Sequence, residues 1–279
     1  MTHEKGARKM RSPIRTPIKY MGGKGQLASK LIPLFPEHNH YVEVFGGGGG
    51  LLMAKAPSLN ETYNDIDSTL YDFFKVLSDP EKFEQFYRIV MALPYSRKLH
   101  KECQKWQEEI DLIKRVSKWY ICTRQMFNAK ATAWGYSVLI SEGWKWLSII
   151  RDLPLIHKRL LPVQIENLDW HKILKYYDSE TTFFYLDPPY VPTTRSKSGK
   201  YTHEMTIEDH EELVDNLLSV RGKVMLSGYP NDIYTRLEKE GWHRVDFNWF
   251  SHASSQKESK EVRRRTECVW MNYQEMRLF

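Results

Sequence analysis

The sequence predicts an α/β protein built on a doubly wound, mostly parallel sheet that carries one inserted subdomain. Seven short β-like runs are spread along the chain, and several are apolar on both faces, as strands covered by helices on both sides are. Helical segments lie between these runs. One interval between runs is far longer than the roughly dozen residues that a crossover needs, and this predicts the insertion.

Hydrophobic spacing and capping residues define the expected elements. One helix over 24–34 follows a Gly pair, and another over 68–77 carries apolar residues at helical spacing. A third helix, over 207–220, begins after Thr206 with Asp209 in the position that completes a capping box. The expected strands cover residues 41–45, 62–64, 163–166, 182–187, 223–227, 243–249 and 267–273.

The long interval sets the expected domain organisation. Residues 79–159 read mainly as helices and form the predicted inserted subdomain, whereas residues 13–78 and 160–279 form the main domain. Residues 1–12 are basic but are not followed by an apolar stretch, so we expect a flexible tail rather than a secretory signal.

Composition excludes several classes of protein. The 279 residues are 41% hydrophobic, enough for a sizeable core, and no apolar run approaches the roughly 18 residues of a membrane helix. Three scattered cysteines make a poor disulfide framework and the histidines lack metal-ligand spacing, so we expect a cytoplasmic protein without a metal. The net charge of +6 fits a polyanionic partner without proving one.

A glycine loop marks a candidate ligand site. The first strand runs into five consecutive glycines, residues 46–50, where the lack of Cβ atoms lets a ligand approach the backbone. The next strand ends at Asp65, which is spaced to accept hydrogen bonds from ribose hydroxyls. A tight turn, a dinucleotide site and a site for another adenosine compound are all compatible with this pattern. Glu43, just before the glycines, would repel a pyrophosphate but suits a cationic, amine-bearing ligand such as S-adenosylmethionine.

The apolar strand over 182–187 ends in the tetrapeptide Asp187-Pro188-Pro189-Tyr190, which resembles the catalytic motif of amino-methyltransferases. The chain from about 17 to 275 resembles the Dam-type DNA adenine-N6 methyltransferases. Four motifs in the same order carry this resemblance, and they lie at residues 18–24, 43–46, 64–67 and 187–190. The resemblance implies a seven-stranded S-adenosylmethionine-dependent methyltransferase (Rossmann-like) sheet, with 79–159 as a target-recognition subdomain.

The chemistry of the tetrapeptide can be argued independently. An adenine amine is a poor nucleophile because its lone pair is delocalised into the ring. Asp187 and the carbonyl of Pro188 can each accept one N–H of the amine, which opposes the positive charge that develops on nitrogen. Two prolines fix the backbone, and Tyr190 offers a ring on which the base can stack. The target base must leave the duplex to reach them.

The resemblance also implies a set of cofactor contacts around the glycine loop and the catalytic motif. For the acid near the cofactor adenine we choose Asp169, with Glu166 as a close competitor. The implied cofactor-binding residues are Tyr20, Lys24, Glu43, Phe45, Gly46, Asp65, Ile66, Asp169 and Asp187.

Candidate DNA contacts come from two segments. The basic stretch after the catalytic motif contains Arg195 and Lys197 and would hold phosphates, the alternative being an ordinary surface loop. In the insertion, Arg124, Asn128 and Lys130 belong to a stretch comparable to one that leads to a DNA-contacting hairpin in the family. The resemblance adds Lys19 as a residue that faces DNA.

The sequence therefore predicts a site-specific, adenine-specific DNA methyltransferase that uses S-adenosylmethionine on double-stranded DNA. Three alternatives remain at this stage: methylation of the cytosine amine, methylation of an RNA or protein amine, and a catalytically silent DNA-binding protein of the same fold. A bacterial or phage origin and a cognate restriction endonuclease as biological partner fit the first prediction.

Overall fold

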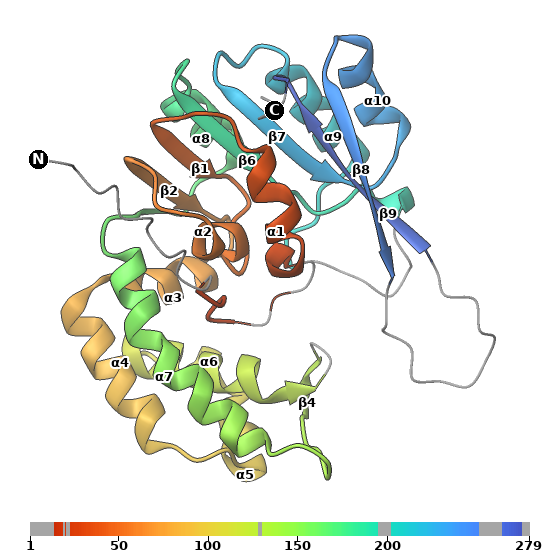
Figure 1. Ribbon diagram of the computed structural model, residues 1–279. Helices are drawn as coiled ribbons and strands as arrows, with labels where there is room; N and C mark the ends of the chain where they lie inside the picture. The colour runs from red at the N-terminus through yellow and green to blue at the C-terminus, as the bar shows by residue number, and fades with distance from the viewer. Residues whose placement is uncertain are drawn as a thin grey trace, which may run out of the picture.

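The computed structural model confirms the α/β class and the seven predicted strands (Figure 1). Five strands run parallel, and the last strand of the chain is antiparallel to both of its neighbours. The order across the sheet is β5-β2-β1-β6-β7-β9-β8. The strands are β1 (His40–Glu43), β2 (Asn60–Asn64), β5 (Gln164–Glu166), β6 (Thr182–Leu186), β7 (Lys223–Gly228), β8 (His243–Phe250) and β9 (Arg264–Met271). The structure describes residues 14–18, 20, 23–127, 130–194, 202–250 and 264–274, so the predicted tail lies outside the described residues.

Two layers of helices cover the sheet because alternate side chains of each strand point to opposite faces. Val42, Phe184 and Trp270 belong to one buried cluster, which α8, α9 and α10 complete. Tyr41 and Phe183 belong to the other cluster, which α1, α2 and α3 share with the helices of the insertion. These helices are α1 (Ala28–Leu31), α2 (Gly50–Ala54), α3 (Ser68–Ser78), α8 (Trp170–Tyr177), α9 (Ile207–Leu217) and α10 (Asp232–Lys239).

Two predicted helices differ in detail from the structure. The segment 24–34 is a short α1 between two 3₁₀ turns, Lys24–Gln26 and Ile32–Leu34, and not one continuous helix. Pro33 explains the second break, because it has no N–H to continue the ladder and its ring crowds the preceding turn. Helix α9 begins with the predicted capping box, in which the Thr206 hydroxyl accepts the backbone N–H of Asp209.

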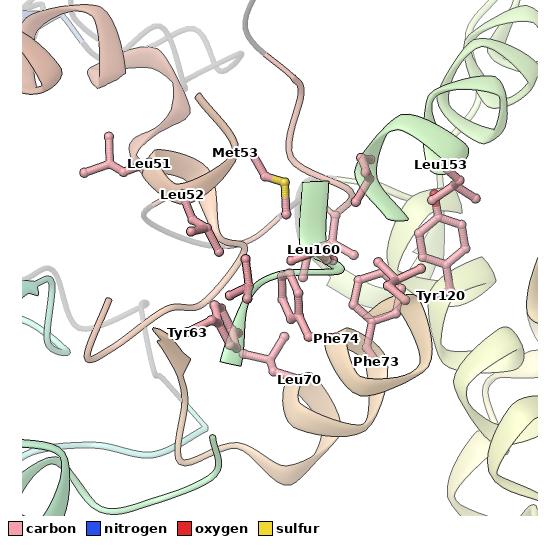
Figure 2. Packing of buried hydrophobic residues seen from close by; sticks show 14 of the residues in the cluster. Leu51, Leu52, Met53, Tyr63, Leu70, Phe73, Phe74, Tyr120, Leu153 and Leu160 are labelled. Atoms are coloured by element: carbon pink, nitrogen blue, oxygen red, sulfur yellow. The ribbon is translucent and has the colours of Figure 1, made fainter. Parts of the chain in front are cut away.

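Between β2 and β5 the chain forms a bundle that lies beneath the sheet in Figure 1. The bundle packs directly on α3, where the Phe73 ring contacts Phe86 of α4. The Phe73 ring also stacks on Tyr120 of α6 (Figure 2). A buried ion pair adds a polar contact, because Arg159 at the end of α7 donates to Glu61 of β2 at 2.8 Å. The domain limits 79 and 159 stay a prediction. The elements are α4 (Pro80–Ala92), α5 (Arg97–Cys103), a 3₁₀ turn (Trp106–Glu108), α6 (Leu112–Gln125), the hairpin β3 (Met126–Phe127) and β4 (Lys130–Trp134), and α7 (Glu142–Leu160).

No helix in the described part of the chain is both long and apolar enough to span a membrane.

Phe73 tests whether the insertion and the sheet share one core. Its side chain is fully buried, so Phe73→Ala should lower the free energy of unfolding by about 3–5 kcal/mol through lost burial and a residual cavity. Leu59→Ala is the matched control, because Leu59 is 80% exposed, and it should change stability by less than about 0.5 kcal/mol. Urea denaturation followed by circular dichroism measures both. Equal effects of the two substitutions would contradict the shared core.

Candidate active site

A pocket of about 320 Å³ opens at the carboxyl ends of β1, β2 and β6. In parallel sheets these ends are where ligands bind, because the loops that follow neighbouring strands converge there. The pocket brings together residues that lie far apart in the sequence, from Tyr20 to Asp187. All the predicted cofactor residues line it, namely Tyr20, Lys24, Glu43, Phe45, Gly46, Asp65, Ile66, Asp169 and Asp187.

The glycine loop, residues 46–50, forms one wall of the pocket. Its shape requires glycine where a side chain would clash and where φ is positive. At Gly46, a Cβ atom would lie 2.2 Å from the Tyr63 ring, so any side chain would displace that ring. Gly47 and Gly49 adopt φ angles of 50° and 65°, which favour glycine. The Tyr63 hydroxyl donates to the carbonyl of Gly47 at 2.8 Å and fixes the turn. The loop therefore presents bare backbone to the pocket.

Asp65 lies at the end of β2 beside this loop. Its carboxylate accepts the backbone N–H groups of Gly47 and Asp67, each at 2.8 Å. Burial raises its pKa to about 6, although these two hydrogen bonds oppose the shift. Because a carboxylate has about four acceptor sites, Asp65 can accept further hydrogen bonds from a ligand hydroxyl.

Glu43 ends β1 on the floor of the pocket and is almost completely buried. It accepts the backbone N–H of Leu52 at 2.9 Å and the Tyr41 hydroxyl at 3.1 Å. Burial raises its pKa to about 8, so the carboxyl group is largely protonated at neutral pH. A cation bound nearby would favour the ionised form.

The structure separates the two acids that the sequence offers near the cofactor adenine. Asp169 lines the pocket and caps α8 by accepting the backbone N–H of His171 at 2.9 Å. Glu166 instead accepts the Tyr177 hydroxyl at 2.8 Å. The His171 ring also pairs with Asp169 and, at 3.0 Å, with Glu212, and these acids raise the pKa of His171 against the opposing effect of burial.

The catalytic motif follows β6 directly and carries a compact charged cluster. The Lys24 ammonium lies 2.8 Å from Asp187 and 3.0 Å from Glu267, and it donates to the Tyr190 hydroxyl at 2.6 Å. The Tyr190 hydroxyl in turn donates to Glu267. Pro188 is buried, and the pocket wall next to Asp187 is formed by Pro189.

The pKa values of Asp187 and Lys24 in this cluster are set by burial and by the neighbouring charges. Burial raises the pKa of Asp187, and Glu267 adds to the shift, while Lys24 opposes it. Burial alone would lower the pKa of Lys24, but the two carboxylates outweigh it and raise that pKa. The ammonium is therefore charged at any physiological pH.

Most of the predicted DNA contacts lie outside the described residues. This holds for Lys19, Asn128, Arg195 and Lys197, and for the side chain of Lys130 at the start of β4. Arg124 lies in the last turn of α6 and is half-buried, and burial lowers its pKa. Its Nε atom has no hydrogen-bond partner among the described residues.

Sequence reasoning missed some residues of this site. Glu267 begins a predicted strand and carries no local signal of its role. Glu267 itself does not line the pocket. The pocket residues that were missed come from the segment before α9 and its first turn, and from the start of α8, where the capping acid Asp169 gave a partial signal. These further residues of the pocket wall are Leu168, Trp170, His171, Thr202, His203, Glu204, Met205 and Asp209.

Comparison with known proteins identifies a family for this arrangement. A sequence profile described as D12 class N6 adenine-specific DNA methyltransferase matches residues 20–249. Type II methyltransferase M1.LlaDCHI of Lactococcus lactis subsp. cremoris is 26% identical, over 93% of this chain and 96% of its own. Type II methyltransferase M.MjaIII of Methanocaldococcus jannaschii is 27% identical, over 79% and 86% of the two chains. Modification methylase StsI of Streptococcus sanguinis is 22% identical, over 89% of this chain and 42% of its own.

Glu43 gives this pocket a measurable signature in stability. Its pKa is 4.5 in the unfolded chain and about 8 in the folded protein, so the folded protein retains a proton that the unfolded chain releases. The resulting stability is complete below pH 4.5 and is lost as the pH rises through about 8. Glu43→Gln should therefore reduce the fall in unfolding free energy between about pH 5 and pH 8.

Urea denaturation at several pH values measures this effect. Glu180→Gln, at an exposed turn position, is the matched control and should leave the pH dependence as in the wild type. An unchanged slope in Glu43→Gln would show that Glu43 ionises normally in the folded protein.

Proposed function

The chain belongs to the D12 class N6 adenine-specific DNA methyltransferase family, and from this premise we propose that it transfers a methyl group from S-adenosylmethionine to an adenine flipped out of double-stranded DNA. The family match confirms the resemblance drawn from the four motifs, and the protein is an N6-adenine DNA methyltransferase. Because the family is adenine-specific, the methylated group is the adenine amine and not the cytosine amine. The methyl donor, the flipped base and the residue roles are the proposal.

One observation carries it: the predicted cofactor residues line the same pocket as Asp187 and Pro189 of the catalytic motif, with Pro188 and Tyr190 buried directly behind them. A methyl group can pass directly from sulfur to nitrogen only if donor and acceptor lie within near-attack distance. Asp65 and Glu43 line the same cavity as Asp187, so a ligand held by the first two has its reactive end near the third. Positioning and electrostatics then supply most of the catalysis.

The residues present fit S-adenosylmethionine. Gly46 and Gly47 bring the backbone of the loop to the pocket wall, and Asp65 beside them can accept ribose hydroxyls. Asp169 also lines the pocket and is the proposed partner of the cofactor adenine. Glu43 is a buried carboxyl whose ionised form a cation would stabilise, and S-adenosylmethionine carries both an ammonium and a sulfonium. When bound, it supplies the electrophilic methyl group.

On the substrate side, Asp187 and the Pro188 carbonyl accept the two N–H groups of the adenine amine. The Tyr190 ring stacks on the base, and its hydroxyl is held by Lys24 at 2.6 Å. As the N–C bond forms and the S–C bond breaks, nitrogen becomes positive and must lose one proton. Asp187 is suited to receive it because burial raises its pKa above the ordinary value.

The insertion, residues 79–159, is proposed to read the DNA sequence, and the basic stretch after the catalytic motif to hold phosphates. Arg124 and Asn128 are the proposed base contacts, with Lys130 beside them. Arg195 and Lys197, together with Lys19, are the proposed backbone contacts. Two relatives are named type II methyltransferases and one a modification methylase, which supports a role in restriction–modification with a cognate endonuclease as partner.

The proposal is tested by incubating the protein with S-adenosylmethionine and duplex DNA and analysing the nucleosides. The expected product is N6-methyladenine, and N4-methylcytosine alone would contradict the family assignment of the target.

Asp187→Ala should fold but lose at least ~10²–10³-fold in rate, because it removes a key acceptor for the amine. The control is Asp215→Ala, at an exposed acid of α9 paired with Arg236, which should keep near-normal activity. Normal rates in folded Asp187→Ala would refute its role.

Asp65 tests the cofactor assignment. Asp65→Asn should weaken S-adenosylmethionine binding by about 1.5–3 kcal/mol, the range for charge-assisted hydrogen bonds. Because the pKa of Asp65 is about 6 and that of Glu43 about 8, wild-type affinity should rise with pH across this interval as both acids ionise. Asp178→Asn is the control, since Asp178 likewise accepts two backbone N–H groups, at 3.0 and 2.9 Å, but in a distant turn. Titration calorimetry showing equal affinity for both variants would remove Asp65 from the site.

A further inference from the structure

Four side chains from three distant parts of the chain meet behind the catalytic motif. Lys24 comes from the 3₁₀ turn before α1, Asp187 and Tyr190 from the motif after β6, and Glu267 from β9. The ammonium of Lys24 has three N–H donors, and its three partners here are Asp187 at 2.8 Å, Glu267 at 3.0 Å and the Tyr190 hydroxyl at 2.6 Å. Because Tyr190 also donates to Glu267, the contacts form a closed ring.

The charges of this ring do not cancel. Two carboxylates share one ammonium, so the cluster carries a net charge of about −1 when both acids are ionised. Side chains of Lys24, Asp187 and Glu267 are only 7%, 19% and 13% exposed, so water screens this charge weakly. A buried unbalanced carboxylate costs free energy unless a cation completes it. The reaction proposed here brings a cationic donor and develops positive charge on the amine nitrogen.

We propose that Glu267 is a positioning residue for methyl transfer, which holds the Lys24 ammonium and the Tyr190 hydroxyl so that Asp187 stays a strong acceptor for the target amine. This inference rests on the proposed function of the site. It assigns a role to β9, a strand that none of the four sequence motifs includes.

The geometry shows how Glu267 acts through its neighbours. If Lys24 had Asp187 as its only carboxylate, the full ammonium charge would fall on that group and weaken it as an acceptor. Sharing the ammonium with Glu267 divides the charge and directs part of it away from the reacting nitrogen. The hydrogen bond from Tyr190 to Glu267 also fixes the plane of the ring that stacks on the base. The Tyr229 ring supports it from another side, with ring centres 4.6 Å apart.

Removal of the Glu267 charge has a predictable sign. Glu267 raises the pKa of Asp187, so Glu267→Gln should lower that pKa and make Asp187 a weaker base. The acid limb of the methylation rate should then move to lower pH while the maximal rate falls. The other charged or titratable groups that act on or sense Asp187 are Lys24, Tyr190, Glu43, Tyr185 and Tyr234.

The experiment measures single-turnover methylation of duplex DNA at saturating cofactor and DNA, across pH, for wild type and variants. We expect Glu267→Gln to slow the reaction about tenfold or more, as the loss of a hydrogen bond to a charged group does. Separate concentration series of DNA and of cofactor should give half-saturating concentrations within about threefold of the wild-type values. Glu238→Gln is the matched control, because Glu238 accepts the Trp270 indole N–H from the same strand at 2.9 Å but lies outside the pocket. It should behave as wild type.

Tyr190→Phe provides a second probe that leaves β9 unchanged. It removes the hydroxyl that Glu267 accepts but keeps the ring. In the proposed arrangement the double variant Glu267→Gln with Tyr190→Phe loses less rate than the product of the two single losses, because both remove the same contact. Strictly multiplicative losses would overturn the proposal.

Two further outcomes would also overturn it. One is a wild-type rate and pH profile in folded Glu267→Gln. The other is a rate loss that matches lost thermal stability, with the acid limb unmoved, because a purely structural role predicts that pattern. Failure of the proposed function is distinguishable, since then the wild type itself forms no N6-methyladenine under the same conditions.

Discussion

The buried ammonium of Lys24 is the interaction on which the catalytic end of the pocket depends. Two buried carboxylates, Asp187 and Glu267, would repel each other strongly in a weakly hydrated site without a cation between them. Lys24 supplies that cation. It also ties the N-terminal segment to the middle and the end of the chain, so that the position of the Tyr190 hydroxyl is set by groups from all three.

The insertion is bound to this sheet by packing and by charge. Phe73 contacts rings of α4 and α6, and Arg159 brings the end of α7 onto Glu61 of β2. An ion pair so deeply buried stabilises one arrangement in particular, because any displacement would leave uncompensated charges. The segment proposed to read DNA is thereby held in register with the glycine loop, since the guanidinium of Arg159 also donates to the carbonyl of Leu52 in α2. The proposed recognition segment and the proposed catalytic pocket thus pack on one shared core.

Local patterns in the sequence predicted the strands and the capping box at Thr206, because each is encoded by neighbours a few positions apart. The predicted cofactor residues also line the pocket, but that set came from the family resemblance of four separate motifs. The break at Pro33 was visible in principle but was outweighed by the apolar spacing around it. Glu267 could not be predicted in the same way. Its role arises from the pairing of β9 with β7, which brings the end of the chain next to the catalytic motif. Tyr190 and Glu267, which form a hydrogen bond, are 77 positions apart in the sequence. The proposed DNA contacts depend on segments outside the described residues, with Arg124 as the half-buried exception.

Burial of acids in this pocket has a consequence for turnover. Glu43 and Asp65 have raised pKa values because burial disfavours their charged forms, and a cationic methyl donor would compensate that burial. Methyl transfer converts a sulfonium into a neutral thioether, so the product lacks part of the charge that the carboxylates stabilise. Ligands that differ by one charge near buried acids differ in affinity, since the electrostatic interaction is strong where water is excluded. The same carboxylates that favour binding of the proposed donor would therefore favour release of its product. Burial of Glu43 costs free energy in the free protein, and this burial lets the pocket discriminate between the charged donor and its less charged product.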